Sequence, residues 1–328
     1  MPLDDAIKNL IAEAEKQFVL SSGTEPLIKK IQVAMQGLDV KYHELGLAFQ
    51  HNILATIAVV EMPFTLACAS ADNAQFRRIH TAQRIDQRIR RARSGYTPTP
   101  LSTDEPIEED DERQALENAL KESEKFRESD EGQNCIVRDL CSFLINIVSH
   151  RKLSDAANEL TLQGSVLLWG AIEVLCRDSF VVYLNAHPEA AKLLLAQPDL
   201  RKRFELQYLP FEALLEHNFD LSSHMGTALS HVKDLTDLET IKQVFDTLFL
   251  ETTTTRSPFR DKQMWVLYQQ RHLIVHRRAV IDTTYVEKTK GAVVVGERLS
   301  ILPSEFKANL NLIVEAGASI LESLPKAI

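Results

Sequence analysis

The chain has 328 residues, of which 45% are hydrophobic and 25% are charged. This balance excludes a disordered or fibrous protein and is typical of a soluble globular protein that is long enough for two domains. With only 11 glycines and 12 prolines, and with apolar residues at steps of three and four, the sequence offers few of the turns that an all-β protein needs. We therefore predict an all-α fold.

The formal net charge of −9 argues at first against a nucleic-acid partner, because phosphate binding relies on basic surface. The charge is unevenly distributed, however. Residues 104–131 hold thirteen acidic and four basic side chains, a net of −9, so the remainder of the chain is neutral overall. The composition is therefore compatible with RNA binding by another part of the chain.

The sequence contains four cysteines, none in a Cys-x-x-Cys pair: Cys68, Cys135, Cys141 and Cys176. No basic segment followed by an apolar core indicates a secretory signal, so we expect a reducing, cytoplasmic setting. Polar residues, among them Glu61 and Pro63, interrupt the apolar stretch from Leu45 to Ala71. A membrane span needs about 20 largely apolar residues. We predict a buried helix here and no membrane partner.

Residues 1–93 are predicted to form an amino-terminal helical region. An apolar stripe from Leu3 to Phe18 indicates the first helix. Thr24, followed by an acidic residue and a proline, is a suitable start for a second helix that runs towards Met35. The apolar stretch from Leu45 to Ala71 is the third.

Residues 75–93 combine apolar residues at three- and four-residue steps with seven arginines, which predicts a narrow amphipathic helix. Residues 94–107 contain three prolines and break this helix. Residues 108–131 predict an acidic helix with a thin apolar stripe. We treat residues 94–131 as a linker and hairpin arm, and we predict an antiparallel hairpin in which the arginine face meets the acidic face.

Two interpretations of the arginine helix are open at this point. Its charges can form an intramolecular salt-bridge network with the acidic helix. Alternatively, they can dock RNA, with Arg84, Arg88 and Arg91 as the contacts. A membrane-surface helix is disfavoured, because the apolar stripe is thin and lacks tryptophan.

Residues 132–328 are predicted to form a helical domain. The expected helices lie at about 135–148, 155–186, 238–250, 258–278 and 304–324. Residues 252–257 are a polar connector. Short apolar runs on both sides of Lys288-Thr289-Lys290-Gly291 predict a small β-hairpin near 286–296.

Chemistry-bearing side chains gather at the end of the otherwise apolar helix before Asp282, namely Arg271, His272 and His276. A guanidinium suits phosphate oxygens, and an imidazole near its reference pKa of about 6.5 accepts or gives a proton at neutral pH. Cleavage of an RNA phosphodiester requires such groups: a base for the 2′-hydroxyl, an acid for the leaving oxygen, and positive charge at the phosphorus.

The spacing of Arg271 and His276 constrains how they can act together. Five residues at about 100° each put them about 140° apart on an ideal helix, so they do not share a face. They converge only if the arginine side chain curls round the helix, or if two copies of the helix meet across a symmetric dimer. The second arrangement yields a composite cleft with two arginines and two histidines, and we expect a homodimer.

At these residues the sequence resembles the HEPN superfamily. Arg271 and His276 match its Arg-x4-His motif, and Glu173-Val-Leu-Cys-Arg177 matches the Glu-x3-Lys/Arg motif that the family often carries on an earlier helix. Glu173 and Arg177, four residues apart, lie on one helix face. The sequence after His276, with Val-Ile-Asp-x-x-Tyr, a glycine-containing turn and a closing helix, is similar to the RiboL-PSP-HEPN subgroup. The resemblance covers about residues 153–324.

The resemblance implies a bundle of about four helices, dimerisation that joins two Arg-x4-His motifs, and a metal-independent endoribonuclease that uses no cofactor and leaves 2′,3′-cyclic phosphate ends. Such domains occur in toxin–antitoxin and anti-phage defence systems. An antitoxin or regulatory protein is therefore an expected partner beside the RNA substrate. The amino-terminal region is expected to supply regulation, partner contact or substrate selection.

The resemblance also assigns roles to individual residues. His276 is the expected general acid or base, and Arg271 is expected to bind the scissile phosphate. Glu173 and Arg177 are expected to orient that pair or to contact RNA, and His272 to assist. Two further RNA contacts are expected beside them: Arg277 and Arg278.

Other interpretations fit the same residues. The domain can be a non-catalytic module for RNA or nucleotide binding or for dimerisation, or the chain can be a scaffold assembled through the hairpin of residues 77–131. Glu173 and Arg177 also fit a plain helix ion pair. His272 and His276 have the spacing of metal ligands, but no third ligand is evident. Four more histidines are expected to be structural or on the surface: His150, His217, His224 and His231.

Overall fold

A computed structural model describes residues 5–20, 23–93, 109–204, 211–249 and 258–325. Regular structure in these residues is helical, apart from isolated bridge residues such as Val280, which forms an antiparallel bridge with Arg298. The predicted all-α class is confirmed. Leu3, the proline-containing break at 94–107 and the connector at 252–257 lie outside the described residues.

The chain folds into two compact units, each built from two separate stretches of sequence. Unit 1 comprises residues 1–20 and 61–157, and unit 2 comprises residues 21–60 and 158–328. This division differs from the predicted boundaries at 93 and 131. The reason is that helices from the amino-terminal region complete the core of the carboxy-terminal half.

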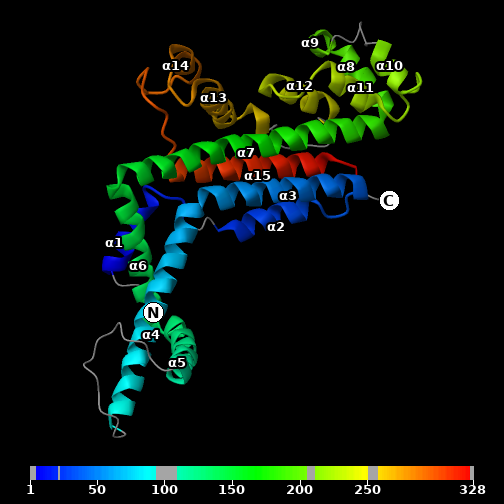
Figure 1. Cartoon of the computed structure of the whole chain (residues 1–328). Coiled ribbons are helices and arrows are strands. Elements are labelled where there is room, and N and C mark those ends of the chain that lie inside the picture. Colours follow the sequence, from blue (N-terminus) through cyan, green and yellow to red (C-terminus); the bar gives the residue numbers. More distant parts are fainter. Residues whose placement is uncertain (1–4, 21–22, 94–108, 205–210, 250–257, 326–328) are drawn as a thin grey trace. The chain divides into compact units, whose positions relative to one another are not determined.

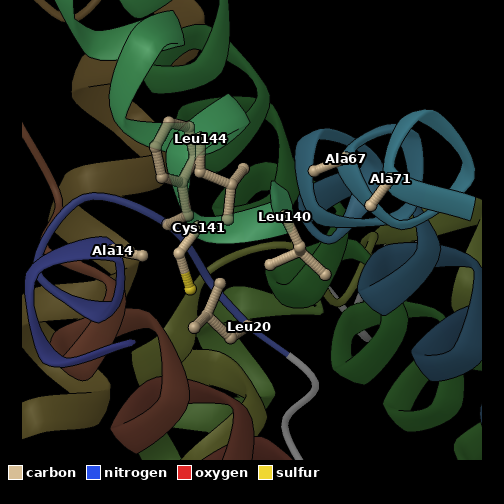
Figure 2. Packing of buried hydrophobic residues seen from close by; sticks show 8 residues of the cluster. Ala14, Leu20, Ala67, Ala71, Leu140, Cys141 and Leu144 are labelled. Carbon is tan, nitrogen blue, oxygen red and sulfur yellow. The ribbon is translucent and has the colours of Figure 1, made fainter. Parts of the chain in front are cut away.

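Unit 1 is formed by α1 (Asp5–Glu15), α4 (Met62–Arg93), α5 (Glu109–Glu128) and α6 (Asp130–Ser149). Ser129 begins α6, because its side chain accepts a hydrogen bond from the backbone N–H of Gly132. The short alanine side chains on α4 let this helix approach α6 closely. The buried core comes from α1 and the segment after it, from α4 and from α6: Ala14, Phe18, Leu20, Ala67, Ala71, Leu140, Cys141 and Leu144 (Figure 2).

Helices α4 and α5 form the predicted antiparallel hairpin. Ala115 and Ala119 of α5 are fully buried. Ion pairs join the helices, among them Arg91 with Asp111 at 3.0 Å, Arg84 with Glu112 at 2.9 Å, and Arg127 with Asp72 at 3.6 Å. Arg88 also has an interaction partner. Arg84 and Arg91 thus form the ion pairs that the salt-bridge interpretation predicts, and an RNA contact by these residues stays a prediction.

The single helix predicted between Leu45 and Ala71 was wrong. Helix α3 (Val40–Val60) ends before Glu61, and α4 begins at Met62 with Pro63 as its second residue. A proline fits the first turn of a helix, where its missing N–H is not needed, but it disrupts a helix interior. The arginine-rich segment is therefore the second half of α4.

Within the described residues, no single helix is both long enough and apolar enough to cross a membrane. Helix α3 and residues 62–91 reach the required length and apolar character only when they are taken together across the bend at Glu61.

Four helices build the main layer of unit 2: α2 (Thr24–Ala34), α3, α15 (Pro303–Ser323) and the part of α7 (Arg151–Ala186) from residue 158 onward. In Figure 1, α7, α15 and α3 run alongside one another. Two glycines permit this close packing. A Cβ atom at Gly317 of α15 would collide with the ring of Phe49, and one at Gly164 of α7 would collide with the side chain of Val60.

Short helices follow α7 in unit 2. Gly226 lies against the backbone of Val181 in α7, which leaves no room for a side chain. Asp237 caps α12 by accepting from the backbone N–H of Thr240 at 2.8 Å. The elements are η1 (Pro188–Ala190), α8 (Ala191–Ala196), α9 (Pro198–Arg203), α10 (Phe211–Glu216), α11 (Met225–Val232), α12 (Leu238–Leu248) and η2 (Pro258–Arg260).

The chain then forms α13 (Lys262–Arg277) and α14 (Thr283–Thr289). The predicted β-hairpin near 286–296 was wrong, because its first arm lies within α14. The side chain of Asp282 caps this helix by accepting from the backbone N–H of Tyr285, whose side chain is buried. Backbone hydrogen bonds instead join residues 279–281 to residues 296–299.

Candidate functional site

The site predicted from sequence lies at the carboxyl end of α13. Pro258 begins the 3-10 turn η2 rather than α13 itself, and α13 starts after Asp261, whose side chain accepts from the backbone N–H of Gln263 at 2.7 Å. The buried residues of this helix are Met264, Leu267, Gln269, Gln270, Leu273 and Ile274. The side chains of His272 and His276, near its carboxyl end, are exposed.

The end of α13 is held in an uncommon backbone conformation. Arg278 and Ala279 have φ values of 53° and 63°, in the left-handed region that usually suits glycine. The backbone N–H of Ala279 donates to the carbonyl of Leu273 at 3.2 Å, which closes the helix. A left-handed conformation at a residue other than glycine costs about 1–3 kcal/mol. At Arg278 and Ala279 this conformation turns the chain away from the helix axis.

Arg271 is held by a residue from the other predicted motif. Its Nη2 atom lies 3.8 Å from Oε2 of Glu173 in α7, and the two side chains are 26% and 20% exposed. The same Oε2 atom accepts a hydrogen bond of 2.8 Å from the indole N–H of Trp169. The ring of Trp169 lies 5.0 Å from that of Tyr268. Glu173 therefore supplies a fixed negative charge that positions the guanidinium.

Arg177 does not take part in this contact. Its Nε atom pairs with Asp178 at 2.9 Å, and the described residues show no ion pair between Arg177 and Glu173. The plain helix ion pair between these two residues is thus not formed. A role of Arg177 in contacting RNA stays a prediction.

The two histidines of α13 form a pair. The ring centroids of His272 and His276 are 4.4 Å apart, and both side chains are exposed. The pKa of His272 is lowered from its ordinary value, chiefly by partial burial and further by the positive charges of His276, Lys288 and Arg271; Asp282 opposes the shift. His272 is consequently neutral at neutral pH and able to accept a proton.

Arg271 and His276 do not touch within one chain. Helix α13 is a regular α-helix through Arg277, so the offset of about 140° holds. No hydrogen bond or ion pair between them occurs in the described part of the chain. The structure instead forms two neighbouring pairs, Arg271 with Glu173 and His272 with His276.

Further basic residues surround these pairs. Arg277 forms an ion pair of 3.2 Å with Asp282, while Arg278 stands at the left-handed end of the helix. The charge of Lys288 on α14 reaches His272. Among the other predicted RNA contacts, Arg84, Arg88 and Arg91, Arg84 pairs with Glu112 and Arg91 pairs with Asp111 of α5 in unit 1.

Other chemistries find less support. All four cysteines are free, and burial raises the pKa of the Cys176 thiol well above its ordinary value, which disfavours a thiolate nucleophile. Among the described residues, no group of three or more histidine, cysteine or acidic side chains is arranged to hold a metal ion. His217 and His224 stack with centroids 4.3 Å apart, in keeping with a structural role.

Comparison with protein-family models, with curated proteins and with solved structures finds no match for this chain. The family resemblance therefore depends on the motif residues alone.

Sequence reasoning overlooked three aromatic residues and one lysine at the site. Trp169 is four residues before Glu173 on the same face of α7, a spacing that could have suggested their hydrogen bond. Tyr268 and Trp265, whose ring centroids are 5.8 Å apart, belong to neither motif. Lys288 was assigned to a β-hairpin, and only its place in α14 brings its charge to His272.

Proposed function

We propose that the chain is a metal-independent endoribonuclease of HEPN type that acts in the cytoplasm as a toxin or anti-phage defence effector. The observation that carries this proposal is that two neighbouring pairs, Arg271 with Glu173 and His272 with His276, lie at one end of α13. Positive charge, a proton acceptor and a proton donor are the groups that cleavage of an RNA phosphodiester uses.

The proposed reaction is an internal transfer within the RNA. His272, which is neutral, removes the proton of a ribose 2′-hydroxyl, and that oxygen attacks the adjacent phosphorus. The bond from phosphorus to the 5′-oxygen of the next nucleotide breaks, and His276 acts as the general acid that gives a proton to the leaving oxygen. Arg271 stabilises the charge on the phosphate oxygens. The products are a 2′,3′-cyclic phosphate end and a 5′-hydroxyl end.

The offset between Arg271 and His276 on a regular helix requires a second copy of the chain in this mechanism. A symmetric dimer that brings two α13 ends together gathers two arginines and two histidines around one RNA phosphate. Val275, between the Arg271 and His276 positions along the chain, is 48% exposed. It offers apolar surface at the centre of the proposed contact.

The test is RNA cleavage by the purified full chain in the presence of EDTA. We expect 2′,3′-cyclic phosphate ends, and we expect Arg271→Ala and His276→Ala each to lower the cleavage rate by about 100-fold or more, the usual contribution of a general acid, base or charge-stabilising group. Arg201→Ala and His231→Ala change exposed residues of the same types and are expected to cleave at the wild-type rate.

Undiminished cleavage by both site variants would reject this assignment. RNA binding without cleavage across varied RNAs would favour the alternative, a non-catalytic RNA-binding or dimerisation module.

A further inference from the structure

A surface cavity of about 520 Å³ lies at the opposite end of α13 from the Arg271 contact. It is formed by α12, η2 and the first turns of α13. Its volume falls in the range of about 300–1,000 Å³ that is usual for small-molecule sites. Three apolar, three cationic and two acidic residues line it: Leu238, Phe259, Trp265, Lys242, Arg260, Lys262, Glu239 and Asp261.

Trp265 is fixed at the wall of this cavity. Its indole N–H donates to the backbone carbonyl of Lys288 at 3.3 Å, and its ring lies 5.8 Å from that of Tyr268. The side chain is only half-buried, whereas Trp169, the other tryptophan of the chain, is fully buried. A rigid, partly exposed indole is a surface on which nucleobases stack.

The cations of the cavity differ in how far they are already paired. Arg260 is bound to Asp246 at 2.6 Å, and Lys242 lies 3.2 Å from Glu239. Lys262 forms no ion pair with any residue of the described chain. Its exposed ammonium group, at the start of the 16-residue helix α13, is therefore available to an anionic group such as a phosphate.

The helix aligns this cavity with the histidine pair. Seven and eleven residues separate Trp265 from His272 and His276, and both offsets return to within about 20° of the same helix face. The rise from Trp265 to His272 is about 10 Å along the axis. A neighbouring nucleotide of an extended strand can span such a distance.

We propose that this cavity is a nucleotide-binding subsite in which a base of the RNA strand stacks on Trp265 while a phosphate contacts Lys262. Its place beside the cleaved bond rests on the proposed ribonuclease function. Because the wall is an aromatic face, the subsite selects for a stacked base, and the strand enters along the outer face of α13.

The first test measures binding of adenosine and uridine 5′-monophosphates to the full chain, by tryptophan fluorescence and by calorimetry. We expect saturable quenching, because only Trp265 is accessible to the nucleotide. Trp265→Ala is expected to weaken binding about 5- to 100-fold, the usual effect of losing one base–aromatic stack. Trp265→Phe should recover most of the affinity, since a phenyl ring also stacks.

The second test separates the phosphate contact from the base contact. Lys262→Ala is expected to weaken nucleotide binding and to reduce its salt dependence, whereas Lys192→Ala, an exposed lysine of α8, is the matched control. If inorganic phosphate or an acidic peptide displaces the nucleotide as well as a second nucleotide does, base stacking contributes nothing and the inference is overturned.

The outcomes distinguish this inference from the ribonuclease proposal. If the protein cleaves RNA but Trp265→Ala does not weaken nucleotide binding, the subsite is overturned and the ribonuclease proposal is unaffected. Nucleotide binding that Trp265→Ala weakens, with no cleavage of any RNA, would support the subsite and overturn the ribonuclease.

Discussion

The carboxylate of Glu173 positions the guanidinium of Arg271, and the indole N–H of Trp169 positions that carboxylate. A guanidinium on a long side chain loses rotamer freedom when it is ordered, at a cost of up to about 2 kcal/mol. The contact of 3.8 Å with Glu173 supplies part of that order before substrate arrives. At the residue scale, the two motifs could be predicted from the sequence. The hydrogen bond from Trp169 was not predicted. Its spacing from Glu173 permits the contact, but residues of an apolar helix face have the same spacing.

Protonation of His272 determines the expected pH dependence of cleavage. The base must be neutral, and the pKa of His272 is lowered, so kcat/KM is expected to rise with pH through a midpoint below the ordinary value of about 6.5. Lys288→Ala removes a charge that lowers this pKa and should move the acid limb to higher pH. Asp282→Asn removes a charge that raises it and should move the limb to lower pH. The measurement is the pH profile of kcat/KM.

Both substitutions keep the backbone contacts at these positions, although Asp282→Asn also removes the ion pair with Arg277. The Lys288 contact with Trp265 uses a backbone carbonyl, and asparagine, like Asp282, can cap α14. Shifts in the same direction for the two variants, or none in either, would show that His272 is not the base.

At the element scale, the hairpin of α4 and α5 illustrates what charge patterning can predict. An arginine-rich face and an acidic face of similar length, separated by a short break, favour pairing on each other. The buried Ala115 and Ala119 show that the thin apolar stripe decides which faces meet. Arg84 and Glu112 then lie within 2.9 Å of each other.

This pairing predicts a salt-dependent loss of stability when the arginines are removed. Exposed ion pairs contribute about 0.2–1 kcal/mol each, so the double variant Arg84→Ala with Arg91→Ala should lower the free energy of unfolding by about 0.5–2 kcal/mol at low salt and by less at high salt. Denaturant titration at two salt concentrations measures it. Arg90→Ala, which breaks only a pair with Asp86 inside α4, is the control.

RNA cleavage by that double variant is expected to match the wild type. Unchanged stability together with weaker, salt-sensitive RNA binding would instead support the RNA-docking interpretation of the arginine helix.

Two elements were mispredicted for physical reasons that act over a few residues. Pro63 was treated as an interruption within a long helix, although it serves as the start of α4. The segment after Asp282 has residues that favour strands, but the cap on the N–H of Tyr285 and the burial of that side chain stabilise a helical turn. In both places a single capping or first-turn residue outweighed the propensity of its neighbours.

The composite cleft makes a prediction for the whole molecule. Arg271→Ala and His276→Ala are each expected to be inactive as homodimers, but equimolar mixing with subunit exchange makes about half of the dimers mixed. A mixed dimer retains one arginine and one histidine in its cleft. Cleavage should therefore reappear well above the level of either variant alone.

A matched control for this experiment is the mixture of Arg271→Ala protein with itself, separately tagged, which must stay inactive. A monomer at working concentrations by sedimentation, with full cleavage activity, would contradict the dimeric site.

The division into units could not be predicted from sequence, because it depends on packing between distant segments. Helix α2 packs on α15, where Lys30 and Glu315 form an ion pair across a separation of 285 residues. Ile31 and Ala34 of α2 are buried. The predicted domain of residues 132–328 consequently lacks α2 and α3, and with them part of the core on which α15 rests.

The pairing of α2 with α15 also bears on how the protein is made. Ribosomes add about 5–20 residues per second, so α2 leaves the exit tunnel roughly 15–60 s before its partner exists. During that interval the apolar faces of α2 and α3 belong to a nascent chain without a finished core. Production of the protein thus favours cells in which chaperones shield the early helices, and slow synthesis prolongs the period in which they can aggregate.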